Sequence, residues 1–140
     1  MTVTATARPA DGALRHEIDV NGRRTITTDA PAKLGGSDTA PAPHELLPAM
    51  LASCLSRMST GYARTRDWEL QDLRVDVTCD PNSTPRKVEL TVNLPDGLAP
   101  DQLKRLKRVA DTCPVKRALE TGFTYEQQIA LDLPTTQPSN

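Results

Sequence analysis

The chain has 140 residues, enough for one domain with its own buried core. Seventeen basic and eighteen acidic residues leave a formal charge of −1, which argues against a nucleic-acid-binding protein that depends on excess positive charge. No apolar run approaches the roughly 18–20 residues of a membrane helix, and residues 1–9 lack the apolar stretch of a secretory signal. We therefore expect a single cytoplasmic domain over 1–140, without nucleic-acid or membrane partners, and with flexible ends at 1–10 and 134–140.

Aromatic residues make up only 3% of the chain, so the core must rest on aliphatic side chains, and we expect a partner subunit to supply part of the burial. The three cysteines, Cys54, Cys79 and Cys113, are odd in number and widely spaced, which argues against a disulfide framework. The only histidines are His16 and His44, and no two cysteines form a C-x-x-C pair. Neither a metal nor a cofactor is therefore expected.

The first elements in chain order are two strands and a loop. Residues 14–20 and 24–28 flank Asn21-Gly22, which is a strong signal for a two-residue hairpin turn. Proline and glycine dominate residues 29–43, and we expect a long loop there. Ordered loops of this length in small domains are often functional.

Apolar residues at three- and four-residue spacing then predict a helix. It should begin near residues 45–47, because Pro48 is accepted only in a first turn, and it should end near Thr65. Cys54 lies beside the apolar stripe, whose members are Leu47, Leu51, Leu55, Met58 and Tyr62.

The next segments alternate apolar and polar residues. Residues 70–78 and 87–94 show this period of two, which predicts half-buried strands. Residues 80–83 (DPNS) form the predicted turn between them.

The remaining elements are two helices and a strand. One helix is predicted to open at Pro100, and Pro114 ends it and begins a second helix over 115–120 that Gly122 closes. Alternation over 125–133 predicts a last strand. The order of elements defines an α+β class with antiparallel sheets.

Two of the cysteines are candidates for chemistry. A cysteine inside a helix, such as Cys54, is commonly a small buried apolar residue, and one before a helix, such as Cys113, is commonly a cap. The positive end of the second short helix would nevertheless favour a Cys113 thiolate. Packing of the helices should bring the two thiols near each other, and neighbouring thiols in a reducing compartment are more often redox-active than structural. Cys54 lies beyond its own helix's first turn and would need a cation from elsewhere, and we assign Cys79 no role.

Residues 43–54 (PHELLPAMLASC) and 110–115 (ADTCPV) resemble the OsmC/Ohr family of osmotically induced and organic hydroperoxide resistance proteins. The resemblance runs from about Gly22 to Ile129, and residues 33–38 (KLGGSD) are similar to the OsmC-like branch. It implies an α+β fold of antiparallel sheets with central helices, assembled as an intertwined homodimer with active sites at the subunit interface.

The resemblance also implies a thiol peroxidase. Cys54 corresponds to the peroxidatic thiolate, which attacks the O–O bond of an organic hydroperoxide and becomes a sulfenic acid. Cys113 corresponds to the resolving thiol, which condenses with it to a disulfide. A dithiol reductant, often a lipoyl group, restores the pair.

The chain departs from the family pattern around these thiols. The peroxidases carry Glu directly after the proline, where this chain has His44, with Glu45 one residue later. The family's activating arginine has no counterpart in the loop, which offers Lys33; the arginines of the predicted hairpin are alternatives. His44 is either a surface residue at the helix start or a pH-sensitive partner of the site. The candidate site residues are therefore Cys54, Cys113, Glu45, His44, Arg23, Arg24 and Lys33, with Arg15 as a further candidate cation.

Two main functions are compatible with these residues, and a third idea is a structural or chaperone-like dimer. The first is a peroxidase that works through a Cys54–Cys113 disulfide cycle. The alternative is a non-enzymatic OsmC-like dimer that binds an apolar small molecule at the subunit interface. The basic residues at positions 104, 105, 107 and 108 are interpreted as a solvated helix face.

Overall fold

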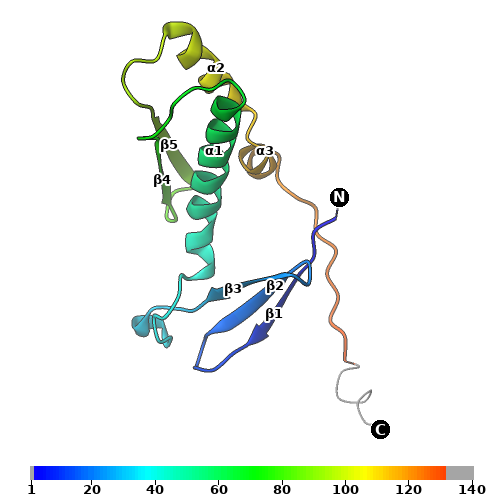
Figure 1. Ribbon diagram of the computed structural model, residues 1–140. Coiled ribbons are helices and arrows are strands. Elements are labelled where there is room, and N and C mark those ends of the chain that lie inside the picture. Colours follow the sequence, from blue (N-terminus) through cyan, green and yellow to red (C-terminus); the bar gives the residue numbers. More distant parts are fainter. Residues whose placement is uncertain (1, 132–140) are drawn as a thin grey trace.

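The computed structural model describes residues 2–131 of the chain. In Figure 1 the long helix α1 (Leu46–Arg64) forms the axis of the molecule. A two-stranded sheet and two shorter helices pack along this helix, and a three-stranded sheet lies beyond its N-terminal end (Figure 1). The prediction of an α+β fold with antiparallel sheets is confirmed. None of the helices within residues 2–131 has the length and apolar character needed to span a bilayer.

The three-stranded sheet consists of β1 (Ala5–Pro9), β2 (His16–Val20) and β3 (Arg24–Thr28), which pair antiparallel in that order. Asn21 and Gly22 have φ angles of 55° and 69°, the left-handed geometry that a tight hairpin turn requires, so the predicted β2–β3 hairpin is confirmed. β1 was not predicted, because it is exposed along its whole length and its alternating apolar residues, Ala5 and Ala7, are too small to give a strong signal.

The predicted loop after β3 is organised around a buried carboxylate. It contains two single 3₁₀ turns, η1 (Ala32–Leu34) and η2 (Pro43–Glu45). Asp29 is 2% exposed, and its carboxylate accepts hydrogen bonds from the backbone N–H groups of Ala30 (2.8 Å) and Thr39 (3.0 Å). These bonds and one from the Thr39 hydroxyl lower the pKa of Asp29 to about 2. One ionised side chain therefore links residues 30 and 39 of the loop, alongside the loop's own backbone hydrogen bonds.

Helix α1 begins and ends where the apolar periodicity predicts. The Glu45 carboxylate accepts a hydrogen bond from the Ala42 backbone N–H (2.8 Å), which caps the preceding 3₁₀ turn, and Pro48 falls in the first turn of α1. Beyond the end of the helix, Asp67 adopts a φ of 57°, which reverses the chain. The buried residues of α1 are Leu51, Cys54, Leu55, Ser59 and Ala63.

The second sheet is an antiparallel pair, β4 (Arg74–Asp80) and β5 (Lys87–Asn93), that packs against α1. The predicted first strand over 70–78 starts four residues too early, because the Leu73 N–H bonds to the Leu70 carbonyl (3.2 Å) in a turn.

Two helices complete the described fold, α2 (Pro100–Asp111) and α3 (Pro114–Thr121), and both begin at the prolines that predicted them. The predicted final strand is not formed: residues 122–131 have no secondary structure, and Tyr125 and Ile129 are 85% and 82% exposed. A strand needs a neighbouring strand to satisfy its backbone groups, and the described part of one chain offers none here. The last residues of that prediction, and the tail from 134, lie outside the described residues.

Candidate active site

The two cysteines singled out by the sequence share one small core. Cys54 projects from α1 and is 9% exposed, and Cys113 stands between α2 and α3 and is 0% exposed. With Leu55 they form one buried cluster. The half-buried residues packed against this cluster are Met58, Val75, Leu90, Ala110 and Val115.

The N-terminus of α3 reaches both sulfurs. Cys113 is the N-cap residue, and its Sγ accepts a hydrogen bond from the Lys116 backbone N–H at 3.5 Å. The backbone N–H of the neighbouring Val115 acts on Cys54 and lowers the pKa of that thiol. Pro114, the first residue of the helix, has no backbone N–H and therefore needs no hydrogen-bond acceptor there. The positive end of α3 therefore faces two thiols from different elements, whereas the sequence pattern assigned it to Cys113 alone.

The balance of effects raises the pKa of Cys54. Burial contributes most, because it disfavours the charged form, and the adjacent Cys113 thiol acts in the same direction. The Val115 N–H and the positive charge of Arg57 act against them. Cys54 therefore favours the neutral thiol in the single chain.

The other predicted site residues lie away from the thiols in the single chain. His44 and Glu45 are exposed in η2, ten and nine residues before Cys54, which corresponds to roughly 14–15 Å along a helix. Arg23 and Arg24 are exposed at the β2–β3 hairpin, in the sheet beyond the N-terminal end of α1 (Figure 1).

Two further cations lie in or beside the loop before α1. Lys33 is exposed in η1. Arg15 donates to the Thr39 hydroxyl (2.8 Å), which in turn donates to Asp29. The structure thus brings together Cys54 and Cys113, and none of the residues predicted to activate them.

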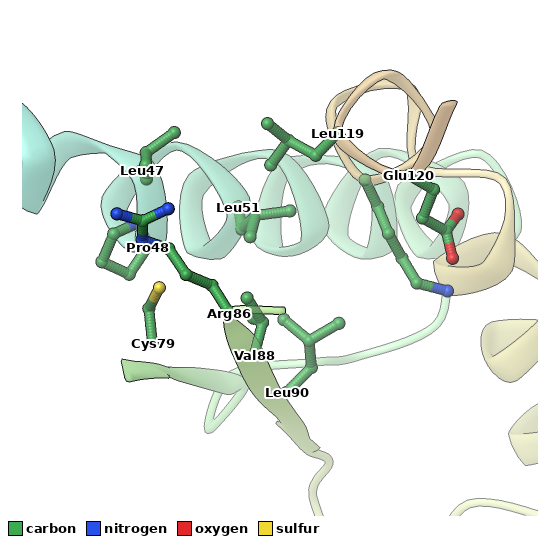
Figure 2. A pocket seen from close by; sticks show the side chains of 10 residues that line it. Leu47, Pro48, Leu51, Cys79, Arg86, Val88, Leu90, Leu119 and Glu120 are labelled. Carbon is green, nitrogen blue, oxygen red and sulfur yellow. The ribbon is translucent and has the colours of Figure 1, made fainter. Parts of the chain in front are cut away.

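An apolar pocket of about 470 Å³ lies between α1, the β4–β5 sheet and α3. Figure 2 shows the leucines of α1 and α3 facing the side chains of β5 across it, with the Cys79 thiol near Pro48. Leu90 belongs both to this pocket and to the packing around the thiol cluster. The residues that line the pocket are Leu47, Pro48, Leu51, Cys79, Arg86, Val88, Leu90, Lys116, Leu119 and Glu120.

A second, more open groove of about 590 Å³ lies between α1 and α2 and carries three arginines. Met58 lines it, and its Sδ lies 3.9 Å from the Cys54 Sγ, so the groove comes within one side chain of the nucleophile candidate. Sequence reasoning missed Arg57 in this groove, although its position three residues after Cys54 was visible. The lining residues are Arg57, Met58, Gly61, Tyr62, Thr65, Arg105, Arg108, Val109 and Thr112.

Solved structures share this fold and its arrangement of elements. The chain is similar to a Psychrobacter arcticus protein named for osmotic stress induction and a detoxification response, with 28% identity and a TM-score of 0.66 over 84% of this chain and 87% of that one. It is also similar to a Vibrio cholerae organic hydroperoxide resistance protein with captopril bound in one of its active sites, with 25% identity and a TM-score of 0.59 over 85% and 84%. The organic hydroperoxide resistance protein OhrB of Bacillus subtilis, at 22% identity and a TM-score of 0.51 over 84% and 89%, shares the fold.

The likeness to these structures shows that the protein has the OsmC/Ohr fold, and two of its thiols are buried in one cluster. The family model described as OsmC-like protein matches residues 35–127, two thirds of the chain, so the protein belongs to the OsmC-like family. The comparison with curated protein sequences gives no match.

Proposed function

We propose that the protein is a thiol peroxidase that reduces organic hydroperoxides, with Cys54 as the nucleophile and Cys113 as the resolving thiol. The observation that carries the proposal is the burial of both thiols in one cluster at the start of α3. Membership of the OsmC-like family and the likeness to an organic hydroperoxide resistance protein support it.

The reaction needs two sulfurs and an external reductant. The Cys54 thiolate attacks the terminal oxygen of the hydroperoxide, the O–O bond breaks, and the leaving alkoxide takes a proton to become an alcohol. Cys54 is then a sulfenic acid. The Cys113 sulfur attacks it, the S–S bond forms, and the hydroxyl leaves as water. A dithiol of the lipoyl type reduces the disulfide by thiol–disulfide exchange and becomes a disulfide itself.

The pocket of Figure 2 suits the organic part of such a substrate. Its walls are mainly leucine, valine and proline side chains, and it adjoins the thiol cluster through Leu90. An alkyl or aryl group held there leaves water, and Leu90 lies between the pocket and the cluster that contains Cys54. Lys116, whose backbone already bonds to Cys113, lines the same pocket.

We propose that the working unit is a homodimer. The extended segment 122–131 exposes four large apolar side chains, between 60% and 85%, and a single chain in water gains nothing from this arrangement. The members of this group are Phe123, Tyr125, Ile129 and Leu131. A second chain that covers them would also bring a second copy of Arg23, Arg24, Lys33, His44 and Glu45, and these are the groups that we propose to reach Cys54 from the partner.

The experiment is stoichiometric oxidation of the full chain by cumene hydroperoxide. One equivalent should remove the mass of two hydrogen atoms, and peptide mapping should find a Cys54–Cys113 bond. Cys54→Ser should abolish peroxide consumption, whereas the matched variant Cys79→Ser should retain it. Thiols that stay unchanged in a large excess of hydroperoxide would contradict the proposal.

The apolar pocket and the raised pKa of Cys54 also support a second candidate, a non-enzymatic dimer that binds an apolar small molecule. The same variants separate the two functions. If wild type and Cys54→Ser bind a fluorescent fatty acid equally and neither consumes hydroperoxide, the binding function holds and the peroxidase does not.

A further inference from the structure

The groove between α1 and α2 continues the face of α1 that carries Cys54. Residues three, four and seven positions apart lie on the same side of a helix, so Arg57, Met58 and Gly61 follow Cys54 along one stripe. All three line the groove. Gly61 has no atom within 4 Å of the place where a Cβ would stand, so the groove remains open at that turn.

Arg57 is the first charged residue on this stripe. Arg57 is exposed, and it lies three residues, a little less than one turn of α1, after Cys54. The ion pairs within residues 2–131 are Arg74–Asp76 and Arg105–Asp101, so no carboxylate in that range neutralises Arg57.

We propose that Arg57 supplies positive charge beside Cys54 and stabilises its thiolate, in place of the arginine that the loop before α1 lacks. The proposal rests on the function proposed above, in which Cys54 is the nucleophile. Arg57 is a positioning residue in this account, because it acts on the substrate only through the Cys54 sulfur. An arginine suits this role because it stays charged at every physiological pH.

Among the groups that the described part of one chain places around Cys54, Arg57 is the cation. α3 contributes the Cys113 thiol and the Val115 N–H, and the sheet contributes only the apolar Val75 and Leu90 to the cluster. The charge of Arg57 lowers the pKa of Cys54, although burial and Cys113 outweigh it. From α2, Arg105 and Arg108 line the groove further along, and Asp101 neutralises Arg105 at 3.1 Å.

The experiment measures ionisation of Cys54 without any peroxide. In a full chain carrying Cys79→Ser and Cys113→Ala, Cys54 is the only thiol, and the ultraviolet absorbance of its thiolate can be followed against pH at low salt. Arg57→Gln should lower the thiolate fraction near pH 8 by about two- to fivefold, the effect of one exposed charge. At a pH high enough to ionise Cys54 completely, the chains with and without Arg57→Gln should give the same thiolate absorbance.

Two variants control for structural effects. Arg57→Lys keeps the charge and should retain most of the thiolate fraction. Arg64→Gln removes the same charge from an exposed position ten residues from Cys54, about 15 Å along α1, and should leave the titration unchanged. If Arg57→Gln and Arg64→Gln titrate alike, the inference is wrong.

The failure of this inference can be told from failure of the proposed function. If the chain with its native cysteines consumes hydroperoxide while Arg57→Gln leaves the Cys54 titration unchanged, the peroxidase is supported and the role of Arg57 is contradicted. If the chain does not consume hydroperoxide but Arg57→Gln shifts the titration, the role of Arg57 is supported and the peroxidase is contradicted.

Discussion

The Met58 Sδ lies 3.9 Å from the Cys54 Sγ, one turn further along α1. Met58 also lines the groove between α1 and α2, so its thioether separates the groove from the candidate nucleophile. A methionine in this place blocks direct access to Cys54 with a flexible side chain that other rotamers can move aside.

We therefore predict that Met58→Ala opens the groove onto Cys54. In a Cys79→Ser chain, alkylation of Cys54 by N-ethylmaleimide should become several-fold faster, and urea unfolding should show a loss of about 2 kcal/mol for the truncated half-buried side chain. Met50→Ala, on an exposed position of the same helix, should change neither the rate nor the stability appreciably. An alkylation rate that does not rise in Met58→Ala would show that the groove does not reach the thiol.

Asp29 should make stability depend on pH in the acid range. Its pKa is lowered from 3.8 to about 2 by the hydrogen bonds of Thr39, Ala30 and Ser37, so the folded chain favours the ionised form more than the unfolded chain does. The stabilisation is then fully present above about pH 4 and is lost as pH falls through about 2.

Asp29→Asn tests this pH dependence. It should lower the Tm at pH 7, and the difference from wild type should narrow steadily as the pH falls from 4 toward 2. Asp38→Asn, an exposed carboxyl in the same loop, should follow wild type throughout. A Tm difference of constant size between pH 7 and pH 2 would contradict the prediction.

Replacement of two glycines by alanine should change the free energy of unfolding in opposite directions. A Cβ on Gly36 would overlap the carbonyl oxygen of Ala30, and Gly36→Ala should cost about 1–3 kcal/mol of the free energy of unfolding. Gly61 lies inside α1 with open space around it, and Gly61→Ala should add about 1 kcal/mol through helix propensity. Urea unfolding at one fixed protein concentration measures both changes, and equal signs would contradict the geometry described for one of them.

The exposed segment 122–131 should control assembly. Sedimentation of the wild type should give a dimer, and Ile129→Glu combined with Leu131→Glu should shift it toward monomer, because two carboxylates would have to be buried in an apolar contact. Gln128→Glu, which has the opposite parity along the extended chain, should leave the dimer intact. A wild type that sediments as a monomer at high concentration would refute the proposed assembly.

Elements with a local chemical signal could be predicted from the sequence. Asn21-Gly22 defines the β2–β3 hairpin because both residues accept left-handed φ angles. Pro48, Pro100 and Pro114 predict the helix starts because proline fits a first turn and disrupts a helix interior. The closeness of Cys54 and Cys113 could also be predicted, because each lies on or beside the apolar face of its helix.

Features that depend on contacts across the chain could not be predicted. β1 exists because its backbone pairs with β2, and its small, exposed side chains give only a weak alternating pattern. Residues 125–131 have the right alternation and no strand beside them within the described chain. The Val115 N–H meets Cys54 because two helices pack in a particular way, and no pattern in either helix records that.

The capping role of Cys113 ties the oxidation state of this sulfur to the geometry of a helix. Its Sγ accepts a hydrogen bond from the Lys116 N–H in the first turn of α3, so a disulfide at Cys113 would form on the atom that caps this helix. The same helix carries Leu119 and Glu120 into the wall of the apolar pocket. Chemistry at this sulfur would therefore take place at the end of a helix that also shapes the pocket.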